Sequence, residues 1–98
     1  MKSYMVEVPL PAEPPQEFFA LIPSQRMKIA ELMTKRKIIS YTVSADRRKL
    51  WIVMVAESEQ EARNILIEQP MDKYFRYTFH ELMFHEMAGM AFPSVSLN

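Results

Sequence analysis

The apolar residues of this chain change their spacing along the sequence, and the order of these changes constrains the fold more than any single motif. Runs of strand length alternate with stretches of helical spacing, in the order strand, helix, strand, strand, helix, strand. The strands are expected at Tyr4–Val8, Ile38–Val43, Leu50–Ala56 and about Tyr74–Phe84, and the helices at Gln16 to about Lys35 and between Ser58 and Pro70. With 98 residues, the chain is expected to form one domain, 1–98, in which 86–98 are a C-terminal tail.

The helix limits follow from local chemistry. Ser58 is the expected N-cap of the second helix, because Glu61 stands three residues later and completes a capping box. Pro70 ends that helix. In the first helix Pro23 predicts a kink, or two helical pieces joined at Ser24, which could cap the second piece.

This order of elements is that of the α+β ferredoxin-like fold, βαββαβ, a four-stranded antiparallel sheet with two helices on one face. The other face of the sheet is then left uncovered. We expect it to carry Met5, Leu50, Ile52 and Met54 together with polar groups. Exposed apolar surface of this kind marks a partner surface, so we expect a homodimer or higher homo-oligomer in which two sheets stack face to face.

Composition excludes several classes of function. Twelve basic residues balance twelve acidic ones, so no nucleic-acid partner is expected, and the basic runs 35–37 and 47–49 are interpreted as solvated turns. Cysteine is absent, and Gly89 is the only glycine, which excludes nucleotide cofactors bound through glycine-rich loops. No cofactor is expected. No apolar stretch approaches the ~18 residues of a membrane helix, and the N-terminus lacks a signal-peptide core, so we expect no membrane partner and a cytoplasmic location.

The stretch "YTFHELMFHE" holds both histidines of the chain. His80 and His85 are five residues apart, which places them on opposite faces of a strand or roughly 140° apart on a helix, so no metal site is expected. In a strand, His80 and Arg76 face away from the helices and can meet Glu7 of the neighbouring first strand. A carboxylate beside an imidazole can move a proton near neutral pH. The alternative is an ion pair at the dimer interface.

Four aromatic residues are candidates for a ligand cavity between the helices and the sheet. They are Tyr4, Tyr41, Trp51 and Tyr77. The alternative is that they fill the core, since aromatic side chains commonly do so in a small domain.

Several segments together resemble the muconolactone isomerase-like group of the dimeric α/β-barrel superfamily. These are "VPLP" after the first strand, a long helix running into "KIISY", and "ESEQEARNILIEQPM" followed by "KYFRYTFHELMFH". Gln69-Pro70-Met71 and Tyr74 resemble the Leu-Pro-Leu turn and nearby tyrosine of that group, and His85 matches a histidine after its last strand. Two departures are Lys37, where the group tends to have glycine at the end of the first helix, and Tyr41 as the sole aromatic residue of a strand that often carries tryptophan.

The resemblance implies a small cofactor-free enzyme that moves a proton next to a carbonyl on a small lactone or aromatic-derived acid. His80 or Glu7 would be the base, and Arg76 would hold a substrate carboxylate through its forked guanidinium. Two alternatives stay open: a non-catalytic dimeric module that binds a small ligand, and a monooxygenase of the same barrel type.

Overall fold

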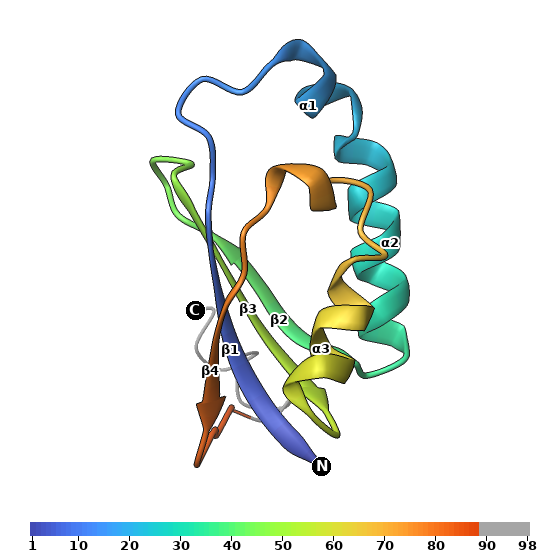
Figure 1. Cartoon of the computed structure of the whole chain (residues 1–98), viewed down its shortest axis with the longest axis vertical. Coiled ribbons are helices and arrows are strands. Elements are labelled where there is room, and N and C mark those ends of the chain that lie inside the picture. Colours follow the sequence, from blue (N-terminus) through green and yellow to red (C-terminus); the bar gives the residue numbers. More distant parts are fainter. Residues whose placement is uncertain (89–98) are drawn as a thin grey trace, which may run out of the picture.

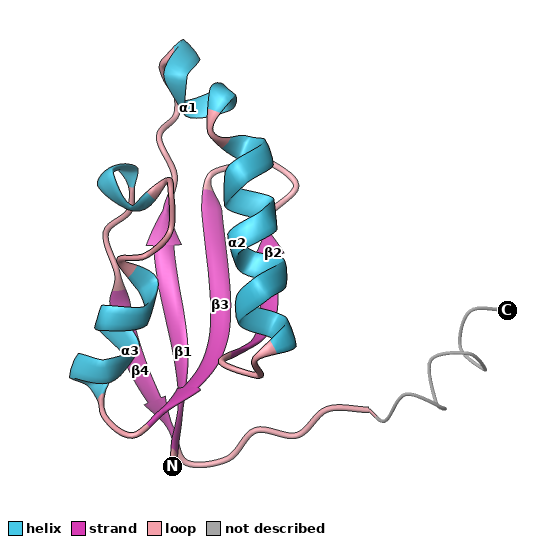
Figure 2. Cartoon of the chain, turned by 90° about the vertical axis from the view of Figure 1, so that its right-hand side faces the viewer, coloured by secondary structure: helices cyan, strands magenta, loops and turns pink. Residues whose placement is uncertain are grey.

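A four-stranded antiparallel sheet with helices on one face makes up the molecule. The computed structural model describes residues 1–88, and its elements are β1 Lys2–Pro9, α1 Gln16–Ala20, α2 Ile22–Thr34, β2 Ile38–Val43, β3 Lys49–Ala56, α3 Glu59–Leu66, the 3-10 helix η1 Asp72–Tyr74, and β4 Thr78–Leu82. The strands lie in the order β2-β3-β1-β4 (Figure 1). Figure 2 shows the helices together on one side of the strands. The predicted α+β ferredoxin-like fold is confirmed.

Of the expected tail 86–98, residues 89–98 lie outside the described part of the chain, and 83–88 follow β4 without regular secondary structure. None of the helices within residues 1–88 has the length and apolar character that crossing a membrane requires.

The first helix is broken at Leu21, and the predicted break at Ser24 is wrong. Leu21 is both the C-cap of α1 and the N-cap of α2, and Pro23 lies in the first turn of α2. A proline fits there because the first N–H groups of a helix have no intrahelical partner. Ser24 is already helical, and its hydroxyl donates to the carbonyl oxygen of Leu21 at 3.0 Å.

The last strand is shorter than the sequence predicts. The strand is expected to begin at about Tyr74, but Tyr74 is the last residue of η1. Pairing with β1 starts only at Thr78, opposite Glu7. If the same register continued for two more residues, Arg76 would lie opposite Pro9, which has no N–H to donate to the ladder. The segment before Thr78 is therefore left out of the sheet.

Pairing between β1 and β3 decides which side chains face the helices. Tyr4, Val6 and Val8 of β1 pair with Met54, Ile52 and Leu50 of β3. All six are buried in the core cluster under the helices. The prediction that Leu50, Ile52 and Met54 lie on the uncovered face is therefore wrong; only Met5 of that group does. The sequence of β3 is apolar on both faces, so the pattern itself does not distinguish them.

We call the uncovered side of the sheet the open face. It carries Met5 and Glu7 of β1, Trp51, Val53 and Val55 of β3, and Thr78 and His80 of β4. Val53 is only 4% exposed although no helix covers it. The apolar residues beside it on this face, Met5, Trp51 and Val55, are half-buried, and the polar residues Glu7, Thr78 and His80 share the face with them.

The cap of α3 agrees with the prediction. The Ser58 hydroxyl accepts a hydrogen bond from the Glu61 backbone N–H at 3.1 Å. The Glu61 carboxylate accepts from the N–H of Glu57 at 2.6 Å, one residue before the cap. Ala62, Ile65 and Leu66 are the buried stripe of this helix.

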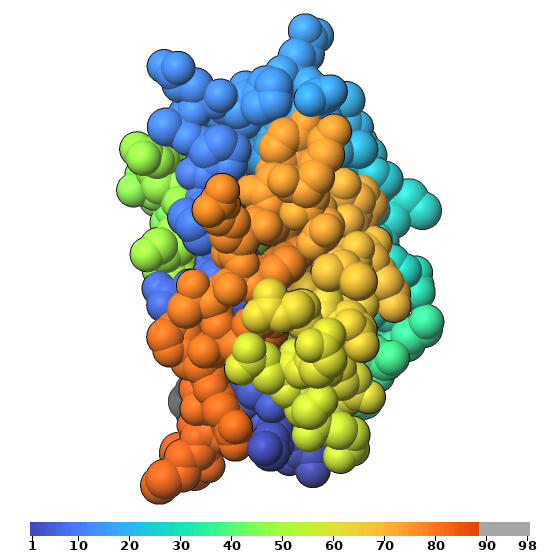
Figure 3. Space-filling view, viewed as in Figure 1, coloured from blue at the N-terminus to red at the C-terminus, as the bar shows by residue number. Residues whose placement is uncertain are grey.

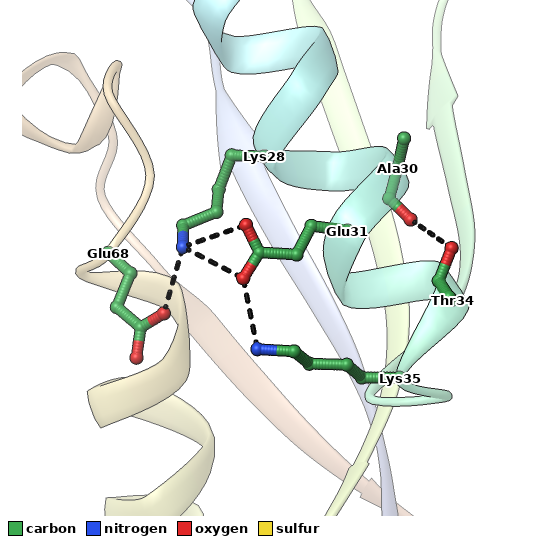
Figure 4. Close-up of polar contacts among 6 residues, drawn as sticks. All are labelled: Lys28, Ala30, Glu31, Thr34, Lys35 and Glu68. Carbon is green, nitrogen blue, oxygen red and sulfur yellow. Dashed lines mark hydrogen bonds and ion pairs between the residues drawn. The ribbon is translucent and has the colours of Figure 1, made fainter.

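A group of charged side chains fixes α2 against the end of α3 (Figure 4). Lys28 Nζ lies 3.3 Å from Glu68 Oε1 and 3.4 Å from Glu31, and Lys35 Nζ lies 3.0 Å from the same Glu31 carboxylate. The hydrogen bond with Glu68 is the main cause that raises the pKa of Lys28, and that with Lys35 is the main cause that lowers the pKa of Glu31. This contact holds the segment before Gln69 beside α2.

Candidate functional site

A pocket of about 920 Å³ lies between α2, the β2–β3 hairpin and the lead-in segment after β1. This volume is within the ~300–1,000 Å³ that small-molecule sites occupy. Its apolar walls include Leu10, Pro11, Phe18, Phe19, Ile22, Ile29, Met33, Val43, Leu50, Met71 and Phe75. Most of the enclosed space is therefore suited to an apolar ligand body.

Residues 10–15, which we call the lead-in, connect β1 to α1, and together with α1 they line one side of this pocket. The backbone N–H of Leu10 donates to the carbonyl oxygen of Arg48 at 2.9 Å, so the lead-in is tied to the hairpin beside it (Figure 1). Phe18 packs against the ring of Tyr74 with centroids 5.2 Å apart. In the space-filling view the lead-in and α1, in blue, lie directly against the orange segment that holds η1 (Figure 3). One side of the pocket is thereby covered.

Two of the polar residues that line the pocket, Gln25 and Tyr41, are hydrogen-bonded to each other. Gln25 is 3% exposed, and its Nε2 donates to Tyr41 Oη at 3.2 Å and to Gln69 Oε1 at 2.8 Å. Its Oε1 accepts from the backbone N–H of Met71 at 3.0 Å. A backbone N–H can only donate, so this bond decides which end of the Gln25 amide is oxygen.

The same reasoning fixes Gln69, which is also 3% exposed. Its Nε2 donates to the carbonyl oxygen of Leu66 at 2.9 Å and to Tyr77 Oη at 3.0 Å. Tyr77 Oη in turn donates to Asp72 Oδ1 at 2.6 Å. We call the series Tyr41–Gln25–Gln69–Tyr77–Asp72 the buried polar chain. Burial is the first cause that raises the pKa of Tyr77, and the Asp72 carboxylate adds to it.

The orientation of the two amides leaves the hydroxyl hydrogen of Tyr41 without an acceptor within residues 1–88. Both amide hydrogens of Gln25 are donated, so Tyr41 Oη is an acceptor toward it. The hydroxyl hydrogen of Tyr41 has no acceptor within residues 1–88, and the Tyr41 side chain lines the pocket. Burial raises the pKa of Tyr41 above its usual 10.0. Tyr41 is thus a neutral hydrogen-bond donor available to a ligand.

Three arginines lie where the pocket meets solvent, because each lines the pocket and is itself exposed. They are Arg26 of α2 and Arg47 and Arg48 of the β2–β3 turn. Asp46 is the carboxylate of this wall. Its Oδ1 accepts from the Ser44 hydroxyl at 2.6 Å and from the Arg48 N–H at 3.0 Å, and the Ser44 bond is the main cause that lowers its pKa.

On the open face, Glu7 and His80 meet as the strand alternation predicts. His80 Nε2 lies 2.8 Å from Glu7 Oε1, and Lys49 Nζ lies 3.5 Å from Glu7 Oε2. The hydrogen bond from His80 is the main cause that lowers the pKa of Glu7. The sheet separates this pair from the pocket, since Glu7 points away from the side on which Val6 and Val8 are buried.

The other predicted site residues do not gather in one place. Arg76 is exposed and forms no ion pair within residues 1–88. Tyr4 is a core residue, and Tyr77 belongs to the buried polar chain. Trp51 lies on the open face opposite Glu7, so its expected position in a cavity under the helices is wrong. Of the four aromatic candidates, Tyr41 lines the pocket.

The sequence interpretation missed Gln25, Gln69 and the three arginines. A signal for Gln25 exists: it lies four and seven residues before Ile29 and Leu32 and shares their buried helical stripe. A polar residue in such a stripe needs a buried partner. The arginines offered no such signal, since a basic turn is ordinarily solvated.

Within residues 1–88, no three acidic or histidine side chains gather in a metal-binding arrangement. No protein-family model matches this chain, and no curated protein matches it.

Proposed function

We propose that this chain is a small cofactor-free enzyme that resembles muconolactone isomerase and moves a proton next to a carbonyl on a small lactone or aromatic-derived acid. The observation that supports this most directly is that Tyr41 lines a largely apolar pocket and that its hydroxyl hydrogen has no acceptor within residues 1–88. A neutral donor of this kind stabilises the oxygen of a carbonyl as negative charge develops on it.

The reaction needs a base as well as this donor. Loss of a proton from the carbon next to the carbonyl would give an enolate, and return of a proton at another carbon of the conjugated system would give the isomer, with no net change in atoms. Asp46 is our candidate for the base, because its carboxylate lines the pocket and its Oδ2 accepts no hydrogen bond within residues 1–88. Glu7 and His80 do not line this pocket.

We propose a different role for the Glu7–His80 pair. The open face presents apolar side chains of Met5, Trp51 and Val55 around the nearly buried Val53. Stacking of two open faces would bury them and form a homodimer. The Glu7–His80 pair would then lie at the edge of, or within, this interface.

The test is conversion of muconolactone to its enol-lactone isomer, followed by proton NMR. Wild type is expected to accelerate the conversion, and Tyr41→Phe is expected to lower kcat by about 10²-fold, the usual loss for one such donor. Tyr74→Phe is the matched control, because its hydroxyl does not line the pocket. Equal rates for wild type and Tyr41→Phe would contradict the assignment of Tyr41.

A second candidate function is a non-catalytic module that binds a small acid. The observation in its favour is the hydrogen-bonded state of Asp46, whose lowered pKa makes it a weak base. Ligand binding measured by NMR without any conversion of muconolactone or related lactones would select this second function.

A further inference from the structure

The cations around the pocket differ from most others in the molecule. Lys2, Lys28, Lys35, Lys49, Arg63 and Lys73 each have a carboxylate oxygen within 4.0 Å. Arg26, Arg47 and Arg48 have none within residues 1–88, although Asp46 lies on the same wall of the pocket. Within residues 1–88, Asp46 accepts hydrogen bonds from the Ser44 hydroxyl and from the backbone N–H of Arg48. The wall therefore carries three guanidinium groups against one carboxylate.

These guanidinium groups come from two directions. Arg26 belongs to α2, and Arg47 and Arg48 belong to the turn of the facing hairpin. A guanidinium group presents paired N–H donors that match a carboxylate, so guanidinium groups from α2 and from the hairpin turn suit one ligand carboxylate where the pocket meets solvent.

The backbone at Arg47 adds a second observation. Its φ is 62°, in the left-handed region that glycine adopts without a steric penalty. The same is true of Arg36, with φ 60°, at the end of α2. Arg36 does not line the pocket, whereas Arg47 does. Arg36 and Arg47 are thus the same amino acid in the same left-handed backbone conformation, and of the two Arg47 lines the pocket.

Tyr41 marks the opposite, inner end. It lies two residues before Val43, the last residue of β2, so it is about 7 Å further along the strand from the turn. Its free hydrogen requires an acceptor there. A ligand that satisfies both ends carries an oxygen acceptor at one end and an anion at the other.

We infer that the pocket selects a small apolar acid whose carboxylate is held by Arg47, with Arg26 and Arg48, while a carbonyl oxygen at its other end accepts from Tyr41. This inference rests on the pocket of the proposed function and specifies the charge and orientation of its ligand. It does not require that the ligand is converted.

The probes are 4-acetylbenzoate and the neutral 4-acetylbenzamide, which share a shape and differ in charge. Binding is measured for both by calorimetry at low and high salt. We expect wild type to bind the acid at least about tenfold more tightly than the amide, with the preference falling as salt rises. Tyr41→Phe should weaken both probes and keep the preference.

Two glycine substitutions separate the effect of losing an arginine side chain at the pocket from the effect of relaxing a left-handed backbone. Arg47→Gly should reduce the preference for the acid several-fold, whereas Arg36→Gly should retain it. The triple variant Arg26→Gln, Arg47→Gln, Arg48→Gln should bind acid and amide equally. Equal binding of the two probes by wild type, no binding of either, or a preference that survives the triple variant would overturn the inference. Failure of lactone conversion with an intact preference would instead reject only the proposed reaction.

Discussion

The side-chain nitrogen of Gln25 lies 2.8 Å from the side-chain oxygen of Gln69, which joins α2 to the loop after α3 inside the protein. Both amides are held in one orientation by backbone groups, the Met71 N–H and the Leu66 carbonyl. Tyr41 is therefore placed by a contact between segments that are far apart in the sequence.

Replacing Gln25 should destabilise the protein. Gln25→Leu leaves the Met71 N–H and Gln69 Oε1 without a buried partner, at a cost of about 1–3 kcal/mol for each group that stays unsatisfied. Urea unfolding measures the change. Gln60→Leu is the matched control, because Gln60 is exposed on α3 and its loss should change the free energy of unfolding by less than about 0.5 kcal/mol. Similar effects at both positions would show that the buried bonds contribute nothing special.

Removal of the Tyr77 hydroxyl should destabilise the protein more than removal of the Tyr74 hydroxyl. Tyr77→Phe removes the bonds to Asp72 and Gln69 and should lower the free energy of unfolding by about 1–2 kcal/mol. Tyr74→Phe should have a smaller effect, because its hydroxyl is buried and forms no well-aligned hydrogen bond within residues 1–88, although the Glu17 carboxylate adds to the effect of burial in raising its pKa. Thermal unfolding of the two variants checks this. A clear loss of stability in Tyr74→Phe would point to a partner for that hydroxyl.

The Glu7–His80 pair should make stability depend on acid pH. The folded state lowers the pKa of Glu7 below its usual 4.5, so the unfolded chain binds more protons in this range, and stability contributed by Glu7 is lost as pH falls below about 4.5. Glu7→Gln should therefore show a smaller loss in urea midpoint than wild type on going from neutral to acid pH. His80→Gln should reduce the loss in the same way, because His80 is the main cause of the shift. Unchanged pH profiles in both variants would contradict the prediction.

The two left-handed arginines should each limit stability. Arg36 lies just past the end of α2, where its N–H donates to the Met33 carbonyl and that of Lys37 to the Leu32 carbonyl, the pattern in which glycine is usual. Arg36→Gly and Arg47→Gly should each raise the free energy of unfolding by about 1 kcal/mol. Chemical denaturation measures both. A destabilised Arg36→Gly would mean that the side chain contributes more than the backbone conformation costs.

A charge placed on the open face should break the proposed homodimer. Trp51→Glu puts a second carboxylate opposite Glu7 on the open face, and sedimentation velocity at micromolar concentration should show a shift from dimer to monomer. Ile67→Lys is the control, because Ile67 is an exposed apolar residue at the end of α3, away from the sheet. A wild-type protein that sediments as a monomer would reject the homodimer.

The order of strands and helices along the chain, the capped helix α3 and the meeting of Glu7 with His80 could all be predicted, because they depend on the spacing of apolar residues, on local chemistry and on alternation along a strand. The faces of β3 could not, since apolar residues occupy both sides and only the pairing with β1 decides between them. The pocket could not be predicted from the sequence either. Its walls come from a proline-rich lead-in, a helix and a basic turn, and only the tertiary fold shows that the arginines of that turn line an apolar space.

The buried polar chain also limits how charge can travel through this protein. A glutamine amide neither gains nor loses a proton near neutral pH, so Gln25 and Gln69 interrupt any relay between the hydroxyl groups of Tyr41 and Tyr77. The hydroxyl hydrogen of Tyr41 has no acceptor within residues 1–88, so it can exchange with a bound molecule or with water. An occupant that accepts a hydrogen bond from Tyr41 would therefore compete with water for this hydrogen.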